Sequence, residues 1–301
     1  MYAYFAYGLT IASEIKLHGL AEAKGVPDVR VTLGNVPPAL NKPIINTPYE
    51  QISAEEFLLE IKDTAKFYVT NGKDIVIQKA QDCHEGNIQV FLMGTVFAYI
   101  LQYHDYLVLH GSAVLINGAA VIFSGNSGAG KSTTAAAFAK KKYSILTDDM
   151  VAIKSNAVGQ FELIPGWPRL KLWQDALNHF GEKSDRLILV QNKLDKYEFP
   201  IYNTNIQSVP VSAFYELNAT DDESISLHAV TNTVKKIDFL IINTFRYYML
   251  KGLVKRGLHL KQCAALANKI KVSVVNRPKS GYKLDELVTQ IENDLLCQQM
   301  T

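Results

Sequence analysis

The sequence has few cysteines and none of the spacings that cysteine chemistry requires. Cys83, Cys263 and Cys297 are an odd number, lie far apart and form no C-x-x-C pair. We therefore expect neither a disulfide framework nor a cysteine-based zinc site, and the composition agrees with a reducing cytoplasm.

The sequence also lacks a marked excess of charge of one sign. Its formal net charge is +2 over 301 residues. A charge this small does not predict general attraction to nucleic acid or to a membrane surface. We therefore expect no nucleic acid and no membrane among the partners of the protein.

A long uninterrupted hydrophobic run is missing as well. The most apolar segment, Val90 to Tyr103, is interrupted by Gly94 and Gln102, and it falls short of the roughly 20 residues that a membrane-spanning helix needs. The first residues, MYAYFAYG, have no basic region and do not match a signal peptide. These patterns predict a buried helix for this segment and a cytoplasmic location.

What the chain does have is enough apolar material for a full core, since 48% of its residues are hydrophobic. The first part contains short β-type runs at Val29–Leu33, Lys66–Thr70 and Asp74–Gln78, separated by turns such as Asn71-Gly72. The sequence thus predicts a small β-rich N-terminal domain (residues 1–87) and an α/β domain (residues 88–301).

The segment GNSGAGKS, from Gly125 to Ser132, carries the clearest motif of the chain. Its spacing is G-x-x-x-x-G-K-[ST], and it lies between an apolar run and an alanine-rich helical stretch, as in a P-loop. Glycines let backbone N–H groups wrap a phosphate chain, and the helix that follows directs its positive end at the anion. Lys131 can then reach the β- and γ-phosphates, and the Ser132 hydroxyl can ligate Mg²⁺. We predict that the chain binds ATP or a similar polyphosphate together with Mg²⁺.

The strand that leads into this loop has an unusual neighbour. Two β-type runs, Tyr106–Ile116 and Ala119–Phe123, are joined by Asn117-Gly118, which indicates a tight hairpin. In a doubly wound sheet the neighbours of such a strand are parallel and are reached through helices, whereas here the preceding strand should be antiparallel. The predicted fold is therefore an α/β mixed sheet with an antiparallel hairpin entering the P-loop.

Two acids follow the next predicted strand, Lys142–Thr147. Asp148 and Asp149 end a strand beside the P-loop strand, where carboxylates can meet Mg²⁺ and the γ-phosphate. Aspartate is also common in solvated turns, but the position favours the catalytic interpretation.

The remainder of the chain contains helical and β-type patterns that complete an α/β domain. A guanine-binding N-K-x-D tetrapeptide is matched at Asn192–Asp195, but no D-x-x-G switch precedes it, so guanine specificity is disfavoured. Further predicted helices cover Trp173–Phe180, Lys235–Arg256, Leu258–Ile270 and Leu284–Leu296, and strands cover Ser208–Leu217 and Val272–Val275.

These motifs together resemble a known family. The run LHGSAV (Leu109–Val114), the hairpin, the Gly125–Ser132 loop and the triplet Thr147–Asp149 are similar to the catalytic core of HPr kinase/phosphorylase. The likeness is closer to the HPr-kinase-related proteins found beside peptide-modification genes, such as the kinases of lasso-peptide precursors. The segments Pro165–Trp173 and Tyr7–Ser13 also resemble that group, so the likeness spans most of the chain.

The resemblance implies an HPr-kinase-like fold and roles for individual residues. Asp148 resembles the acid that holds Mg²⁺ with Ser132, and Asp149 resembles the general base that faces the substrate serine. His110 resembles the histidine that orients this base and the reacting phosphoryl group, although a lone histidine in an apolar strand would otherwise be read as structural. The phosphate-binding residues implied are Gly125, Asn126, Ser127, Gly128, Ala129, Gly130, Lys131, Ser132 and Thr133.

The resulting hypothesis is a P-loop serine kinase in which Lys131, His110 and Asp149 are catalytic and whose partner is a peptide or protein carrying the acceptor serine. The signature loop that the family uses for phosphorolysis and hexamer contacts is not found, so the reverse reaction and that assembly are left open, as is another homo-oligomer. Arg169 and Arg246 are candidates for the cation that assists transfer. Two alternatives remain: a kinase of a small hydroxylated metabolite such as free serine, and a nucleotide-binding switch without catalysis.

Overall fold

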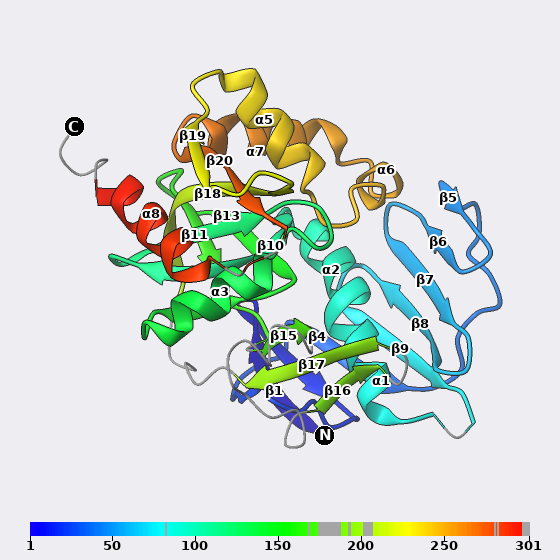
Figure 1. The fold of residues 1–301 in the computed structure, drawn as a ribbon. Helices are drawn as coiled ribbons and strands as arrows, with labels where there is room; N and C mark the ends of the chain where they lie inside the picture. The colour runs from blue at the N-terminus through cyan, green and yellow to red at the C-terminus, as the bar shows by residue number, and fades with distance from the viewer. Residues whose placement is uncertain are drawn as a thin grey trace.

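The computed structural model describes residues 1–81, 83–167, 169–173, 188–191, 194–200, 207–279, 281 and 283–296. It has the α/β class expected from the sequence, with mixed sheets and helices. Figure 1 shows the N-terminal strands (blue to cyan) along the lower and right-hand sides of the molecule and the helices that follow residue 130 (green to red) along its left-hand and upper sides.

The N-terminal part is a mixed sheet. Within the described residues it contains nine strands, in the order β3-β1-β2-β4-β9-β8-β7-β6-β5. The sheet is parallel where β2 pairs with β4 and β4 with β9, and antiparallel elsewhere. Its strands are β1 (Tyr2–Ala6), β2 (Leu9–Ser13), β3 (Ala21–Glu22), β4 (Val29–Leu33), β5 (Ile45–Asn46), β6 (Glu50–Ile52), β7 (Glu56–Ile61), β8 (Ala65–Thr70) and β9 (Asp74–Lys79).

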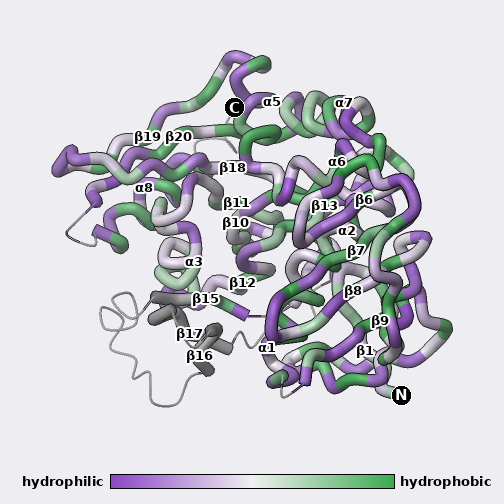
Figure 2. The backbone as a smooth tube through the Cα atoms, turned by 90° about the vertical axis from the view of Figure 1, so that its right-hand side faces the viewer, coloured by the Kyte–Doolittle hydropathy of each residue, from purple (hydrophilic) through white to green (hydrophobic). Residues whose placement is uncertain are grey.

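The central strands of this sheet have the alternation that half-buried strands require. In β8 the buried residues Ala65, Phe67 and Val69 alternate with less buried ones, and Figure 2 shows the mixture of green and purple along these strands. Asn71, Gly72 and Lys73 join β8 to β9, and Asn71 and Gly72 have φ angles of 52° and 57°, as the two central residues of a primed turn require.

A helical segment covers the buried face of this sheet. It consists of α1 (Glu85–Phe91), the π-helical turn η1 (Leu92–Val96) and α2 (Phe97–Tyr103), where the sequence predicts one helix. Its apolar residues share a hydrophobic cluster with the N-terminal sheet, for example Tyr99, whose ring stacks on that of Phe57 at 4.8 Å. The division into domains at residue 87 stays a prediction.

A second sheet carries the glycine-rich loop. Its order is β11-β10-β13-β14-β18-β20-β19, with β12 also paired to β10. The five strands from β11 to β18 in this order form a closed ring of pairings, because β11 also pairs with β18. The strands are β10 (Leu107–Ile116), β11 (Ala119–Ser124), β12 (Ser144–Thr147), β13 (Met150–Ser155), β14 (Phe161–Ile164), β18 (Val209–Thr220), β19 (Ser226–Ala229) and β20 (Lys271–Pro278).

The strand entering the loop, β11, has one antiparallel and one parallel neighbour. It forms an antiparallel hairpin with β10 through Asn117 and Gly118, whose φ angles are 50° and 78°. On its other side it lies parallel to β18, which in turn lies parallel to β20. The sheet around β11 is thus mixed.

Helices cover both faces of this sheet. Alternate residues of β11 face opposite sides, so that Val121 and Phe123 pack with α3 (Lys131–Lys140) and α8 (Leu284–Leu296), whereas Ala120 and Ile122 pack with α5 (Thr233–Ile242) and α7 (Arg256–Ala267). Figure 1 shows the same arrangement, with α3 and α8 on one side and α5 and α7 on the other. The loop therefore starts from a strand that is buried on both faces.

The predicted helix Lys235–Arg256 is wrong in one respect, because it is interrupted. Helix α5 ends at Ile242, and after an irregular stretch the chain forms only the short α6 (Met249–Gly252) before α7. Arg246 and Val254 have positive φ angles of 50° and 58°, which an α-helix does not allow. Backbone bonds to β10 hold the interruption, since Asn243 O accepts from His110 N and Phe245 N donates to Val108 O.

A third sheet of β15 (Arg169–Trp173), β16 (Ile188–Gln191) and β17 (Leu194–Pro200) has the order β15-β17-β16. Trp173 ends β15, so it does not start a helix, and the rest of the helix predicted over residues 173–180 lies outside the described residues. The same holds for Asn192 and Lys193 of the N-K-x-D match, while Leu194 and Asp195 begin β17.

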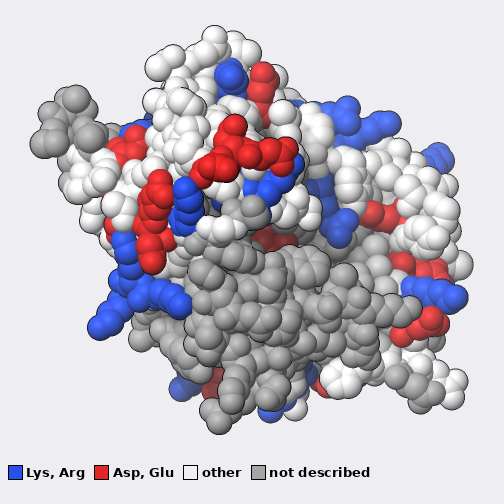
Figure 3. Space-filling view, viewed as in Figure 1, with Lys and Arg blue, Asp and Glu red and all other residues white. Residues whose placement is uncertain are grey.

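In the part of the chain that the structure describes, no helix is long and apolar enough to cross a membrane. On the face shown in Figure 3, blue and red side chains lie interspersed over the described residues. This distribution agrees with the small net charge of the sequence.

Candidate phosphate-binding site

The loop from Gly125 to Gly130 joins the end of β11 to the start of α3. Gly125, Gly128 and Gly130 have φ angles of 130°, 82° and 96°, in the region that favours glycine. Space is limiting at two of them, because a Cβ at Gly125 would lie 2.3 Å from Leu217 O and one at Gly130 2.7 Å from Arg277 Nη2. Both backbone conformation and packing therefore require glycine here.

Lys131, the first residue of α3, turns back into this loop. Its Nζ donates hydrogen bonds to Gly125 O at 2.8 Å and to Asn126 O at 3.1 Å, and the residue is 9% exposed. The first N–H groups of an α-helix have no partner within the helix and carry its positive dipole end. A cation and a helix N-terminus therefore meet at one point, which suits a multiply charged anion.

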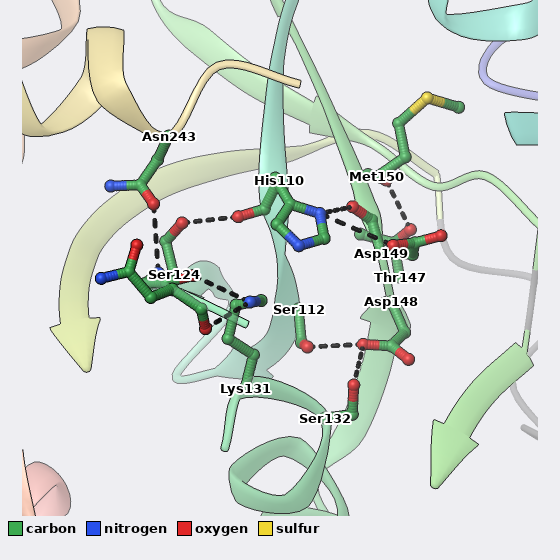
Figure 4. A network of polar contacts seen from close by, with 12 residues as sticks. His110, Ser112, Ser124, Lys131, Ser132, Thr147, Asp148, Asp149, Met150 and Asn243 are labelled. Atoms are coloured by element: carbon green, nitrogen blue, oxygen red, sulfur yellow. Dashed lines mark hydrogen bonds and ion pairs between the residues drawn. The ribbon is translucent and has the colours of Figure 1, made fainter. Parts of the chain in front are cut away.

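The two aspartates form the turn between β12 and β13. Asp148 is buried, and its Oδ1 accepts hydrogen bonds from Ser112 Oγ at 2.5 Å and from Ser132 Oγ at 2.9 Å (Figure 4). Asp149 has a φ of 76°, a conformation that is uncommon for a residue with a Cβ and is often found at functional sites. The turn thus directs Asp148 to Ser112 of β10 and to Ser132 of α3.

His110 of β10 is the partner of Asp149. Its Nδ1 lies 3.0 Å from the Asp149 carbonyl oxygen and 3.5 Å from Oδ1 of the Asp149 carboxylate. A carbonyl oxygen can only accept, so Nδ1 carries a hydrogen. Burial lowers the pKa of His110 below its usual range, and the nearby charge of Lys131 lowers it further. The neutral ring therefore keeps a lone pair on Nε2, which faces away from Asp149 (Figure 4).

Sequence reasoning missed Asn243, which lies at the end of α5. Its Oδ1 accepts a hydrogen bond from Gly125 N at 3.1 Å, and its Nδ2 donates to Glu216 Oε2 at 2.7 Å. Burial raises the pKa of Glu216 to about 7. No local pattern marks Asn243, because its partners, Gly125 after β11 and Glu216 in β18, are distant in the sequence.

Arg277 at the end of β20 was missed for the same reason. Its Nε donates to Ala129 O at 2.7 Å and its Nη2 to Gly128 O at 3.1 Å. The guanidinium group thus joins the glycine-rich loop to the strand two places along the sheet. Neither arginine proposed from the sequence has this place: Arg169 lies over the Trp167 ring, and Arg246 donates to Tyr248.

The glycine-rich loop, the start of α3 and the two aspartates surround a cavity of about 490 Å³, a size typical of small-molecule sites. Among the described residues, Gly125, Asn126 and Ala129 belong to the loop without lining the cavity, and neither Arg169 nor Arg246 lines it. The cavity brings together nine of the predicted site residues, namely His110, Ser127, Gly128, Gly130, Lys131, Ser132, Thr133, Asp148 and Asp149.

The donor set fits a small divalent cation. The Ser132 hydroxyl and the Asp148 carboxylate lie together at the cavity wall, and both offer the hard oxygen atoms that Mg²⁺ prefers. Mg²⁺ sites in proteins that bind nucleotides use one or two carboxylates, and substrate phosphates and water complete the coordination of the ion. Ser132 and Asp148 are therefore the residues that would hold the ion.

Similarity of this chain to known proteins is found among solved structures. No protein-family model matches the chain, and no curated protein matches it. Among solved structures, the Hpr(Ser) kinase/phosphatase from Coxiella burnetii is similar over 64% of this chain and 92% of that chain, at 13% identity and a TM-score of 0.34. A likeness at this level bears neither on the function nor on the site residues.

Proposed function

We propose that the protein is a kinase that transfers the γ-phosphoryl group of ATP to a serine hydroxyl of a peptide or protein. The observation that carries the proposal is the meeting, around one cavity, of a glycine-rich loop, Lys131, the Ser132–Asp148 pair and the His110–Asp149 pair. Binding of a nucleotide alone would need the first three but not the last pair.

The loop and Lys131 supply the electrostatic part of the reaction. Phosphoryl transfer passes through a loose transition state, so that positioning and neutralisation of charge provide most of the acceleration. The side chain of Lys131 turns back into the loop and would neutralise the phosphate oxygens. Mg²⁺ held by Ser132 and Asp148 would neutralise further charge and fix the phosphates in one orientation.

Asp149 would act as the general base. It would accept the proton of the acceptor hydroxyl as the hydroxyl oxygen forms its bond to the γ-phosphorus and the bond to the leaving ADP oxygen breaks. His110 holds the Asp149 main chain through its Nδ1–H and lies beside the carboxylate. His110 would therefore keep the carboxylate directed at the incoming hydroxyl.

Transfer of labelled phosphate from ATP with Mg²⁺ tests this proposal. The acceptors are serine-containing peptides, a protein substrate panel and free serine, which separates a peptide kinase from a kinase of a small metabolite. We expect Asp149→Asn to bind ATP as the wild type does and to lose transfer by at least about 100-fold, the usual contribution of a general base. Lys131→Ala should lose both binding and transfer.

Asp238→Asn is the control, because Asp238 is an exposed acid on α5. It should transfer phosphate at the wild-type rate. If Asp149→Asn also did so, Asp149 would not be the base. If the wild type bound ATP but modified no hydroxyl compound, the nucleotide-binding switch would replace the kinase.

A further inference from the structure

The cavity continues beyond the loop and the two aspartates. Its other end is built by three segments: Ile225 before β19, Pro278 at the end of β20, and Leu284 and Leu287 in the first turns of α8. Helix α8 packs beside α3, the helix that follows the loop. The phosphate-binding end and this second end are therefore parts of one continuous space.

The second end is apolar and firmly packed. Ile225, Leu284 and Leu287 are 8%, 7% and 1% exposed, and all three belong to the hydrophobic cluster that contains α3 and β11. Their positions are fixed by core packing rather than by a surface loop alone. These side chains therefore present a fixed apolar wall to the cavity.

Basic side chains form the rim between the two ends. The Arg277 guanidinium lies against the loop carbonyls at 2.7 Å and 3.1 Å. Lys279 pairs with Asp221 at 3.0 Å, and Lys283 Nζ donates to Glu223 O at 2.7 Å. These contacts join the end of β20 and the start of α8 to the connection before β19, and they place positive charge along the path from the loop to the apolar end.

We propose that the apolar end is the nucleoside subsite, in which Ile225, Pro278 and Leu284 cover the base of the nucleotide. This inference rests on the proposed function. The phosphates would run from this subsite past Arg277 to the loop, and the terminal phosphate would reach Asp148 and Asp149. The acceptor hydroxyl would then enter beside His110 and Asp149, which line the same cavity.

The probe that isolates this subsite is methyl triphosphate, which has the triphosphate of a nucleotide but no base or ribose. Isothermal titration calorimetry with Mg²⁺ compares it with ATP on the wild type, Ile225→Ala and Leu284→Ala. We expect ATP to bind the wild type at least tenfold more tightly than methyl triphosphate. Each variant should bind ATP about fivefold more weakly than the wild type and should bind methyl triphosphate with unchanged affinity. Val211→Ala is the matched control, since Val211 is also 8% exposed but lies in β18 away from the cavity.

The outcomes separate the two proposals. If the wild type binds ATP and methyl triphosphate equally tightly, the nucleoside subsite is wrong while the phosphate site stands. The same holds if both variants lose affinity for the two ligands to the same extent. If Val211→Ala weakens ATP as much as Ile225→Ala does, the effect is general loosening and the subsite is again wrong. If neither ligand binds, the proposed function itself fails.

Discussion

The side-chain oxygen of Asn243 accepts a hydrogen bond from the amide of Gly125, 118 residues away in the sequence, at 3.1 Å. The same residue accepts a bond from His110 N through its carbonyl oxygen at 2.7 Å. Asn243 therefore fixes the first residue of the glycine-rich loop and the main chain of His110 at once. The interruption after α5 is what brings it there.

Replacement of Asn243 by alanine should weaken both the fold and the site. The Gly125 amide and Glu216 would lose their partner, and an unsatisfied buried polar group costs about 1–3 kcal/mol. We expect urea unfolding to show a loss of this size, and calorimetry to show weaker binding of a triphosphate. Asn268→Ala is the control, because Asn268 bonds a carbonyl four residues earlier as Asn243 does but lies in an exposed position. Equal triphosphate affinity in the two variants would contradict a role for Asn243 in the loop.

The two hydroxyls on Asp148 should differ in function. Ser132 lines the cavity, whereas Ser112 is completely buried in β10. Ser132→Ala should therefore raise the Mg²⁺ concentration needed for half-maximal nucleotide binding. Ser112→Ala should mainly lower the free energy of unfolding, by about 1.5–3 kcal/mol for a hydrogen bond to a charged group.

Ser212→Ala serves as the reference for both serine variants, since Ser212 Oγ donates to a main-chain carbonyl in the same sheet. Its Mg²⁺ dependence should equal that of the wild type. A Ser132→Ala protein with an unchanged Mg²⁺ requirement would remove Ser132 from the proposed metal site.

Much of the fold could be predicted from local patterns. The hairpin turns at Asn71-Gly72 and Asn117-Gly118, the glycine-rich loop and helix α8 are each encoded within a few consecutive residues. The interruption of the helix predicted over Lys235–Arg256 could not be predicted in this way. Its apolar spacing is helical, but bonds from Asn243 and Phe245 to β10 override that spacing.

The residues of the site also differ in whether local patterns predict them. Lys131, Ser132, Asp148 and Asp149 follow from motifs beside one another in the sequence, and the structure brings them around one cavity with His110. Asn243 and Arg277 reach the site through contacts between distant segments, and no motif marks them in advance. Ser112 lies within the LHGSAV run, but its bond to Asp148 joins residues 36 positions apart and could not be read from that run.

The charge of Lys131 should have a measurable effect on the pKa of His110. Burial and this charge both lower the pKa of His110, so the neutral imidazole should persist below pH 6.5 in the wild type. Removal of the charge in Lys131→Met should raise the pKa of His110, as read from the imidazole signals in NMR spectra between pH 4 and 8. Lys235→Met should leave this pKa unchanged, because Lys235 is exposed on α5. An identical His110 titration in wild type and Lys131→Met would show that the two groups do not interact.

Glu216 should make phosphate binding dependent on pH near neutrality. Burial raises its pKa to about 7, although Asn243 and Lys131 act in the opposite direction. Below pH 7 the carboxyl is neutral, and above pH 7 its negative charge lies near the loop and repels a polyphosphate. Two unit charges about 10 Å apart interact by roughly 1–2 kcal/mol at an effective dielectric constant of 20. The affinity for MgATP should therefore fall about threefold to tenfold from pH 6 to pH 8.

Glu216→Gln removes the titrating group and keeps a side-chain oxygen for Asn243. The affinity of this variant for MgATP should therefore change less than that of the wild type between pH 6 and pH 8. Glu162→Gln is the matched control, since Glu162 accepts a hydrogen bond from Asn156 Nδ2 at 2.8 Å and lies outside the cavity lining. Titrations at saturating Mg²⁺ make the protonation of the nucleotide the same for all three proteins. The raised pKa also means that the folded state binds this proton more tightly, so that the contribution of Glu216 to stability is lost as pH rises from about 4.5 to about 7. Parallel pH profiles for wild type and Glu216→Gln, in affinity and in unfolding, would show that Glu216 does not titrate in this range.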